Sequence, residues 1–163
     1  MDTLKDLYLD QLQDLYSACE QSRDVTVKLE EAATNADLKE ALHKGHNGIS
    51  AGKDVMAGIL RDHGQEPGKE TCHGMEGLVK EAKAHALEEE FGDDDVRDAM
   101  IITQYQRMAH YAIAGYGCVK AFAERLKLEQ DVELLDKHLS NTYDGDEKMT
   151  ELAKGDINRA AAA

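Results

Sequence analysis

The amino-acid sequence predicts an all-α protein, an up-down four-helix bundle with a short extra helix between the second and third long helices. Apolar residues recur every three or four positions through four long stretches of the 163-residue chain, which is the spacing of one face of an α-helix. Proline occurs once, at Pro67, and aromatic residues make up 5% of the chain, which argues against an all-β fold punctuated by prolines. The pattern therefore favours helices packed on helices.

The first two predicted helices span residues 3–33 and 36–63. In each, one stripe of apolar side chains would face the interior, as with Tyr8, Leu12 and Leu15 in the first helix. A connection of only two to four residues forces the two helices to lie antiparallel. Asn35 or Asp37 is suited to cap the second helix, because a short side-chain oxygen accepts a backbone N–H that has no other partner.

Three glycines, Gly45, Gly48 and Gly52, fall inside the second predicted helix. A glycine in a helix interior costs about 1 kcal/mol relative to alanine. Either a neighbouring backbone or side chain approaches the helix closely at these positions, or the helix is locally loose. The sequence does not distinguish these two explanations.

The remaining predicted helices follow a linker at residues 65–70. They comprise a short helix at 72–90, a long helix at 96–126 and a last helix at 129–154. The long helix has the most regular apolar stripe and an acidic start at residues 93–95, where the helix dipole favours negative charge. We expect one bundle domain at residues 1–157 and a frayed C-terminal tail at 158–163.

The formal net charge is −14, from 33 acidic and 19 basic residues. Nucleic acids and anionic membranes are bound by basic faces, so neither is an expected partner. No stretch approaches the roughly 20 apolar residues of a membrane span, and no cleavable apolar leader precedes the first helix. Cys19, Cys72 and Cys118 are odd in number and lack Cys-x-x-Cys spacing, which predicts reduced thiols in a cytoplasmic protein.

Three segments carry a family resemblance: DLYSA at residues 14–18, MEGLV at 75–79 and HYAIAGYG at 110–117. Together they resemble the YciF/YciE family of ferritin-like, stress-associated bacterial proteins, and the resemblance covers nearly the whole chain. It implies a ferritin-like bundle and a homodimer. It also implies a role linked to stress response, in a family whose biochemical activity is poorly defined.

A ferritin-like di-metal site needs a glutamate on each of two helices and Glu-x-x-His on the other two. When the family pattern is carried onto this chain, small or neutral residues replace most of the ligands. The degenerate metal-site positions implied by the resemblance are Cys19, Asn47, Ser50, Ala109, Ala112, Thr142 and Asp146. We therefore expect no metal cofactor in the bundle centre.

Two functions from different classes follow. The preferred hypothesis is a non-catalytic, dimeric, structural or stress-associated module that has lost its di-metal ligands and whose protein partner is unknown. The alternative is a di-iron or di-manganese oxidase or peroxide-handling protein with an altered ligand set, drawn from Glu20, His46, His110 and Asp146. His43 and His46 are three residues apart on the second helix and could share a helical face, and they are interpreted as partly exposed surface histidines rather than as ligands.

Overall fold

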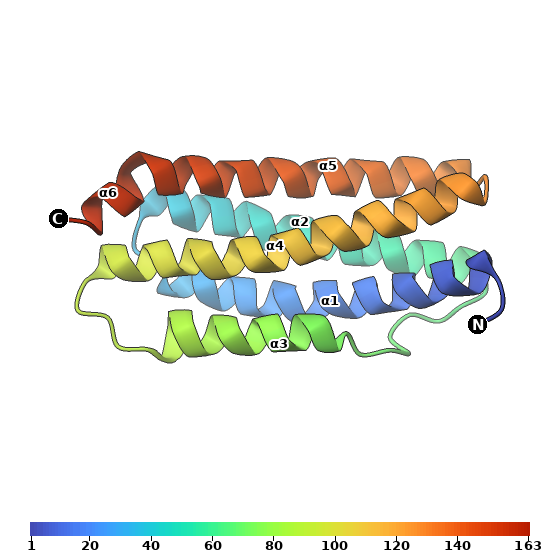
Figure 1. The fold of residues 1–163 in the computed structure, drawn as a ribbon, viewed down its shortest axis with the longest axis horizontal. Helices are drawn as coiled ribbons and strands as arrows, with labels where there is room; N and C mark the ends of the chain where they lie inside the picture. The colour runs from blue at the N-terminus through green and yellow to red at the C-terminus, as the bar shows by residue number, and fades with distance from the viewer.

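A computed structural model describes residues 1–163 and contains helices without any β-strand. Four long helices form the bundle: α1 (Leu4–Ala32), α2 (Ala36–Asp62), α4 (Asp94–Arg125) and α5 (Glu129–Leu152). α1 and α5 each pack against both α2 and α4, so the four helices form a closed ring. Each long helix runs antiparallel to both of its neighbours in this ring (Figure 1). The predicted all-α bundle is thus confirmed.

The extra helix lies outside the ring and carries the chain from one end of the bundle to the other (Figure 1). It consists of α3 (His73–Ala82) followed by a π-helical segment, η1 (Lys83–Glu88), and it packs against α1 and α4. Because this crossover returns the chain along the bundle, α4 runs in the same direction as α2. The second half of the helix predicted at residues 72–90 is this π-helical segment, which is wider than an α-helix. It ends at Glu88, two residues before the predicted end.

Polar side chains fix the starts of the long helices. Thr3 and Asp6 form a capping box at α1, in which each side chain accepts a hydrogen bond from the other residue's backbone N–H. Asn35 caps α2, as the sequence indicated, and Asp93 caps α4. These caps satisfy backbone N–H groups that have no partner within the helix.

The turn between α1 and α2 is held by a buried carboxylate on α4. Asp98, whose side chain is fully inaccessible to solvent, accepts hydrogen bonds from the backbone N–H of Thr34 at 2.9 Å and from its hydroxyl at 2.8 Å. It also accepts the backbone N–H of Asn35 at 2.7 Å. One side chain of α4 thereby fixes the α1–α2 turn and the start of α2.

The hydrophobic interior is divided into two clusters, of 18 and 11 buried residues. The larger cluster includes α3, η1 and the starts of α2 and α4, whereas the smaller one contains the ends of α2 and α4. Along α2 the division falls between Leu42 and Met56, and along α4 between Ala109 and Tyr116. The middle of the bundle is thus the place where the apolar packing is interrupted.

The chain ends with a π-helical turn, η2 (Ala153–Ile157), and a three-residue helix, α6 (Asn158–Ala160). Ile157 is the last buried residue. Fraying of the tail at residues 158–163 stays a prediction. None of the helices has both the length and the apolar character needed to cross a membrane.

Candidate functional site

A cavity of about 370 Å³ lies in the middle of the bundle, where the two hydrophobic clusters separate. Residues from α1, α2, α4 and α5 all contribute to its wall. Four of the positions that the resemblance assigned to a degenerate metal site line this cavity: Cys19, Ala109, Ala112 and Thr142. These four positions lie on α1, α4 and α5.

Two tyrosines of α4 reach across the bundle to the glycines of α2. A Cβ atom added at Gly45 would lie 2.6 Å from Tyr105 Oη, and one added at Gly52 would collide with Tyr116 Oη. A Cβ at Gly48 would meet no atom within 4 Å. Close approach therefore explains Gly45 and Gly52 but not Gly48.

The side chains deep in the cavity are uncharged at neutral pH. Burial raises the pKa of Cys19 to about 12 and that of Tyr105 to about 12, and it holds the pKa of Tyr116 well above its usual value. The Cys19 Sγ and Tyr116 Oη atoms lie 3.7 Å apart. Burial, with a contribution from the Lys137 charge, lowers the pKa of His138, whose ring stacks on Tyr116.

Charged groups line the cavity only at its exposed rim. The one carboxylate there belongs to Asp144, on α5, and two ammonium groups belong to Lys44 on α2 and Lys148 on α5. The lining thus supplies one negative and two positive charges. This balance is unfavourable for holding divalent cations.

The predicted register of the second helix is wrong. Asn47 is exposed, and neither Asn47 nor Ser50 lines the cavity, whereas Gly45 and Gly48, two residues earlier, do. A shift of two residues turns a side chain about 200° around a helix, so Asn47 and Ser50 lie on the opposite face. Asp146 also lies outside the cavity lining.

The altered ligand set proposed from the sequence is not brought together. Glu20 is exposed on α1 and lies 3.7 Å from the ammonium group of Lys53 on α2. His46 contacts Glu30, also between α1 and α2, whereas His110 Nε2 lies 2.9 Å from Asp146 Oδ2, between α4 and α5. These candidates are divided between two different helix pairs. None of Glu20, His46, His110 and Asp146 lines the central cavity.

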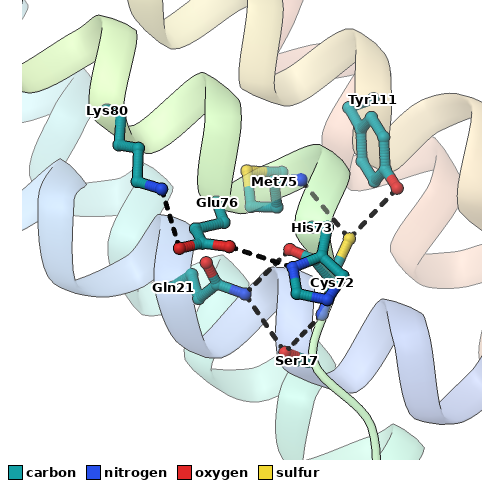
Figure 2. A network of polar contacts seen from close by, with 8 residues as sticks. All are labelled: Ser17, Gln21, Cys72, His73, Met75, Glu76, Lys80 and Tyr111. Atoms are coloured by element: carbon teal, nitrogen blue, oxygen red, sulfur yellow. Dashed lines mark hydrogen bonds and ion pairs between the residues drawn. The ribbon is translucent and has the colours of Figure 1, made fainter.

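The three segments that carry the family resemblance meet at the start of α3 (Figure 2). Cys72 donates its backbone N–H to Ser17 Oγ at 3.0 Å and accepts the Gln21 side-chain amide at its carbonyl oxygen. Its Sγ atom lies 3.0 Å from Tyr111 Oη and accepts the backbone N–H of Met75. Ser17, Met75 and Tyr111 come from the three segments at 14–18, 75–79 and 110–117. Here these segments fasten the crossover helix to α1 and α4.

The geometry defines a class: an all-α bundle with an external crossover helix and a central cavity whose deep side chains are uncharged. The chain belongs to the family described as "Domain of unknown function (DUF892)", whose model matches residues 3–162. Protein YciF of Escherichia coli (strain K12) is 32% identical over 165 residues, which cover 99% of this chain and 96% of that protein. The family resemblance seen in the sequence is thus confirmed.

Two solved structures share the fold. The crystal structure of the E. coli stress protein YciF matches with a TM-score of 0.89 at 30% identity, covering 97% of this chain and 99% of that one. YcfI from Rhodopseudomonas palustris, described as "a putative structural protein", matches with a TM-score of 0.86 at 32% identity. That match covers 92% of this chain and 94% of YcfI.

Proposed function

We propose that this protein is a non-catalytic, ferritin-like module of the stress response, which acts as a homodimer and has lost the di-metal ligands of its bundle centre. The observation that carries the proposal is the pairing of Tyr105 with Gly45 and of Tyr116 with Gly52. Each tyrosine ring ends where a side chain on α2 would begin. A glutamate or histidine at either glycine would have to displace a buried aromatic ring.

The chemistry of the cavity supports the same proposal. Two divalent cations need several carboxylates to bridge them and to offset their charge. The cavity instead offers a thiol and two phenols with raised pKa values, a neutral imidazole and a single carboxylate at the rim. Burying a cation without compensating charge costs several kcal/mol per ion.

The relatives support a structural role in stress. The E. coli homologue is named a stress protein, and the R. palustris homologue is described as "a putative structural protein". In this chain, the segments that carry the family resemblance form packing and hydrogen-bonding contacts around Cys72 rather than a reactive centre. A structural, non-catalytic module fits these observations.

The loss of the di-metal centre predicts a low content of iron and manganese. Protein purified after growth with both metals supplied should contain far less than one iron or manganese atom per chain by elemental analysis. The apo protein should likewise oxidise added Fe(II) in air no faster than a protein-free control. Close to two iron or manganese atoms per chain would refute the proposal and favour the oxidase alternative.

The dimer rests on the family resemblance and is tested separately. Sedimentation equilibrium at micromolar concentrations should give a mass of about twice the 18.0 kDa of one chain. The sample should be treated with a chelator first, so that metal-dependent association does not contribute. A single species at the monomer mass across this concentration range would remove the dimer from the proposal and leave the conclusions about the cavity unchanged.

A further inference from the structure

A cluster of two imidazoles and one carboxylate lies between α1 and α2, outside the central cavity. Glu30 of α1 contacts both histidines: its Oε1 atom lies 3.2 Å from His43 Nδ1, and its Oε2 atom lies 2.8 Å from His46 Nε2. The two imidazole rings are 4.9 Å apart and nearly perpendicular. One ligand atom from each of the three side chains lies within 4.8 Å of the other two. Glu40, three residues before His43 on α2, pairs with Lys44 at 2.5 Å, and the carboxylate that contacts both histidines comes from the neighbouring helix.

We propose that Glu30, His43 and His46 form a binding site for a divalent transition-metal ion, with zinc as the expected occupant. Imidazole nitrogen and carboxylate oxygen are common zinc ligands, at about 2.0–2.2 Å from the ion. At those bond lengths, the ligand atoms of a tetrahedral site are about 3.4 Å apart. The two contacts made by Glu30, one through each carboxylate oxygen, are close to that separation. The three ligand atoms all lie within 4.8 Å of one another, so side-chain rotations that close the remaining gap allow all three groups to reach one ion.

The burial of the cluster suits a bound ion that exchanges with solvent. The side chains of His46 and Glu30 are 14% and 26% exposed, whereas that of His43 is 58% exposed. The ion would enter from the side of His43. Three protein ligands leave a fourth tetrahedral position for water, as in zinc sites that are not purely structural. Because the ligands come from two helices, the ion would also join α1 to α2.

Other histidines of the chain contact carboxylates without forming such a group. His63 contacts Asp131, and His110 contacts Asp146, but each pair contains one imidazole. The pair formed by His110 and Asp146 has nearly the same separation as that of His46 and Glu30, 2.9 Å against 2.8 Å. It therefore supplies a matched control that differs in the number of ligands.

The experiment measures zinc binding to the chelator-treated full chain by isothermal titration calorimetry, with Co²⁺ absorption spectra as a second readout. Wild type should bind one Zn²⁺ per chain and give visible Co²⁺ bands of tetrahedral geometry. Glu30→Gln and His46→Ala should each weaken zinc affinity by at least about tenfold, because each removes a direct ligand. His110→Ala should bind as wild type does.

The possible results of this experiment test the zinc site and the proposed function separately. Failure of the wild type to bind stoichiometric zinc, or equal binding by wild type and His46→Ala, would overturn the zinc site and leave the cavity argument untouched. Circular dichroism shows whether each variant is folded. A misfolded His46→Ala is replaced by His43→Ala, whose exposed side chain makes the substitution mild. Iron or manganese that persisted in His46→Ala would refute the proposed function instead.

Discussion

Replacement of Asp98 by alanine should lower the free energy of unfolding by about 3–5 kcal/mol, because it removes a buried charged acceptor from three hydrogen-bond donors. Two of those donors are the backbone N–H groups of Thr34 and Asn35, which lose their partner at the tight α1–α2 turn. The third is the Thr34 hydroxyl. The loss should appear as a lower urea midpoint, followed by circular dichroism.

Asp94→Ala is the matched control for this measurement. Asp94 lies in the first turn of the same helix, but it is exposed and pairs only with Arg97, at 2.8 Å. Exposed ion pairs are worth about 0–1 kcal/mol, so this variant should stay close to wild type. Similar losses for the two variants would show that the hydrogen bonds of Asp98 do not hold the turn.

The burial and the hydrogen bonds of Asp98 could not be predicted from the sequence. The helices could be predicted because a three-and-four spacing is a local signal, and the capping role of Asn35 was recognised from residues next to it. Asp98 instead bonds to residues 63 and 64 positions away. A single acidic residue near a helix start looks like a surface group, and no local pattern reveals that it is buried.

The same distinction between local sequence patterns and long-range contacts explains which residues at the centre of the bundle could be placed from the sequence. Cys19 and Ala109 lie directly next to segments that carry the resemblance, so their register was fixed, and both line the cavity. The second helix contains no such segment, and its inner face carries glycines where an apolar stripe would have marked the register. Asn47 and Ser50 were therefore placed on the wrong face. Glu30 was missed because its histidine partners are 13 and 16 residues away on another helix.

The glycines of α2 should respond to alanine with opposite signs. Gly48→Ala should raise the free energy of unfolding by about 0.5–1 kcal/mol, because alanine favours the helix and the new methyl group meets no atom. Gly52→Ala carries the same helical gain, but its methyl group collides with Tyr116 Oη. It should lower the free energy of unfolding by about 1–3 kcal/mol, as overpacking does in a close-packed interior.

A double variant tests whether the tyrosine hydroxyl causes that loss. Tyr116→Phe removes the atom that the new methyl group would strike, and the nearest ring carbon, Cζ, would then be 3.5 Å away, an ordinary contact. Combined with Gly52→Ala, it should recover about 1–2 kcal/mol beyond the sum of the two single variants. The comparison is made by urea unfolding of the four proteins. Additive effects would mean that Tyr116 moves aside freely, and a ring that does so leaves room at Gly52 for a ligand side chain. The main structural argument against a metal centre in the cavity would then fail.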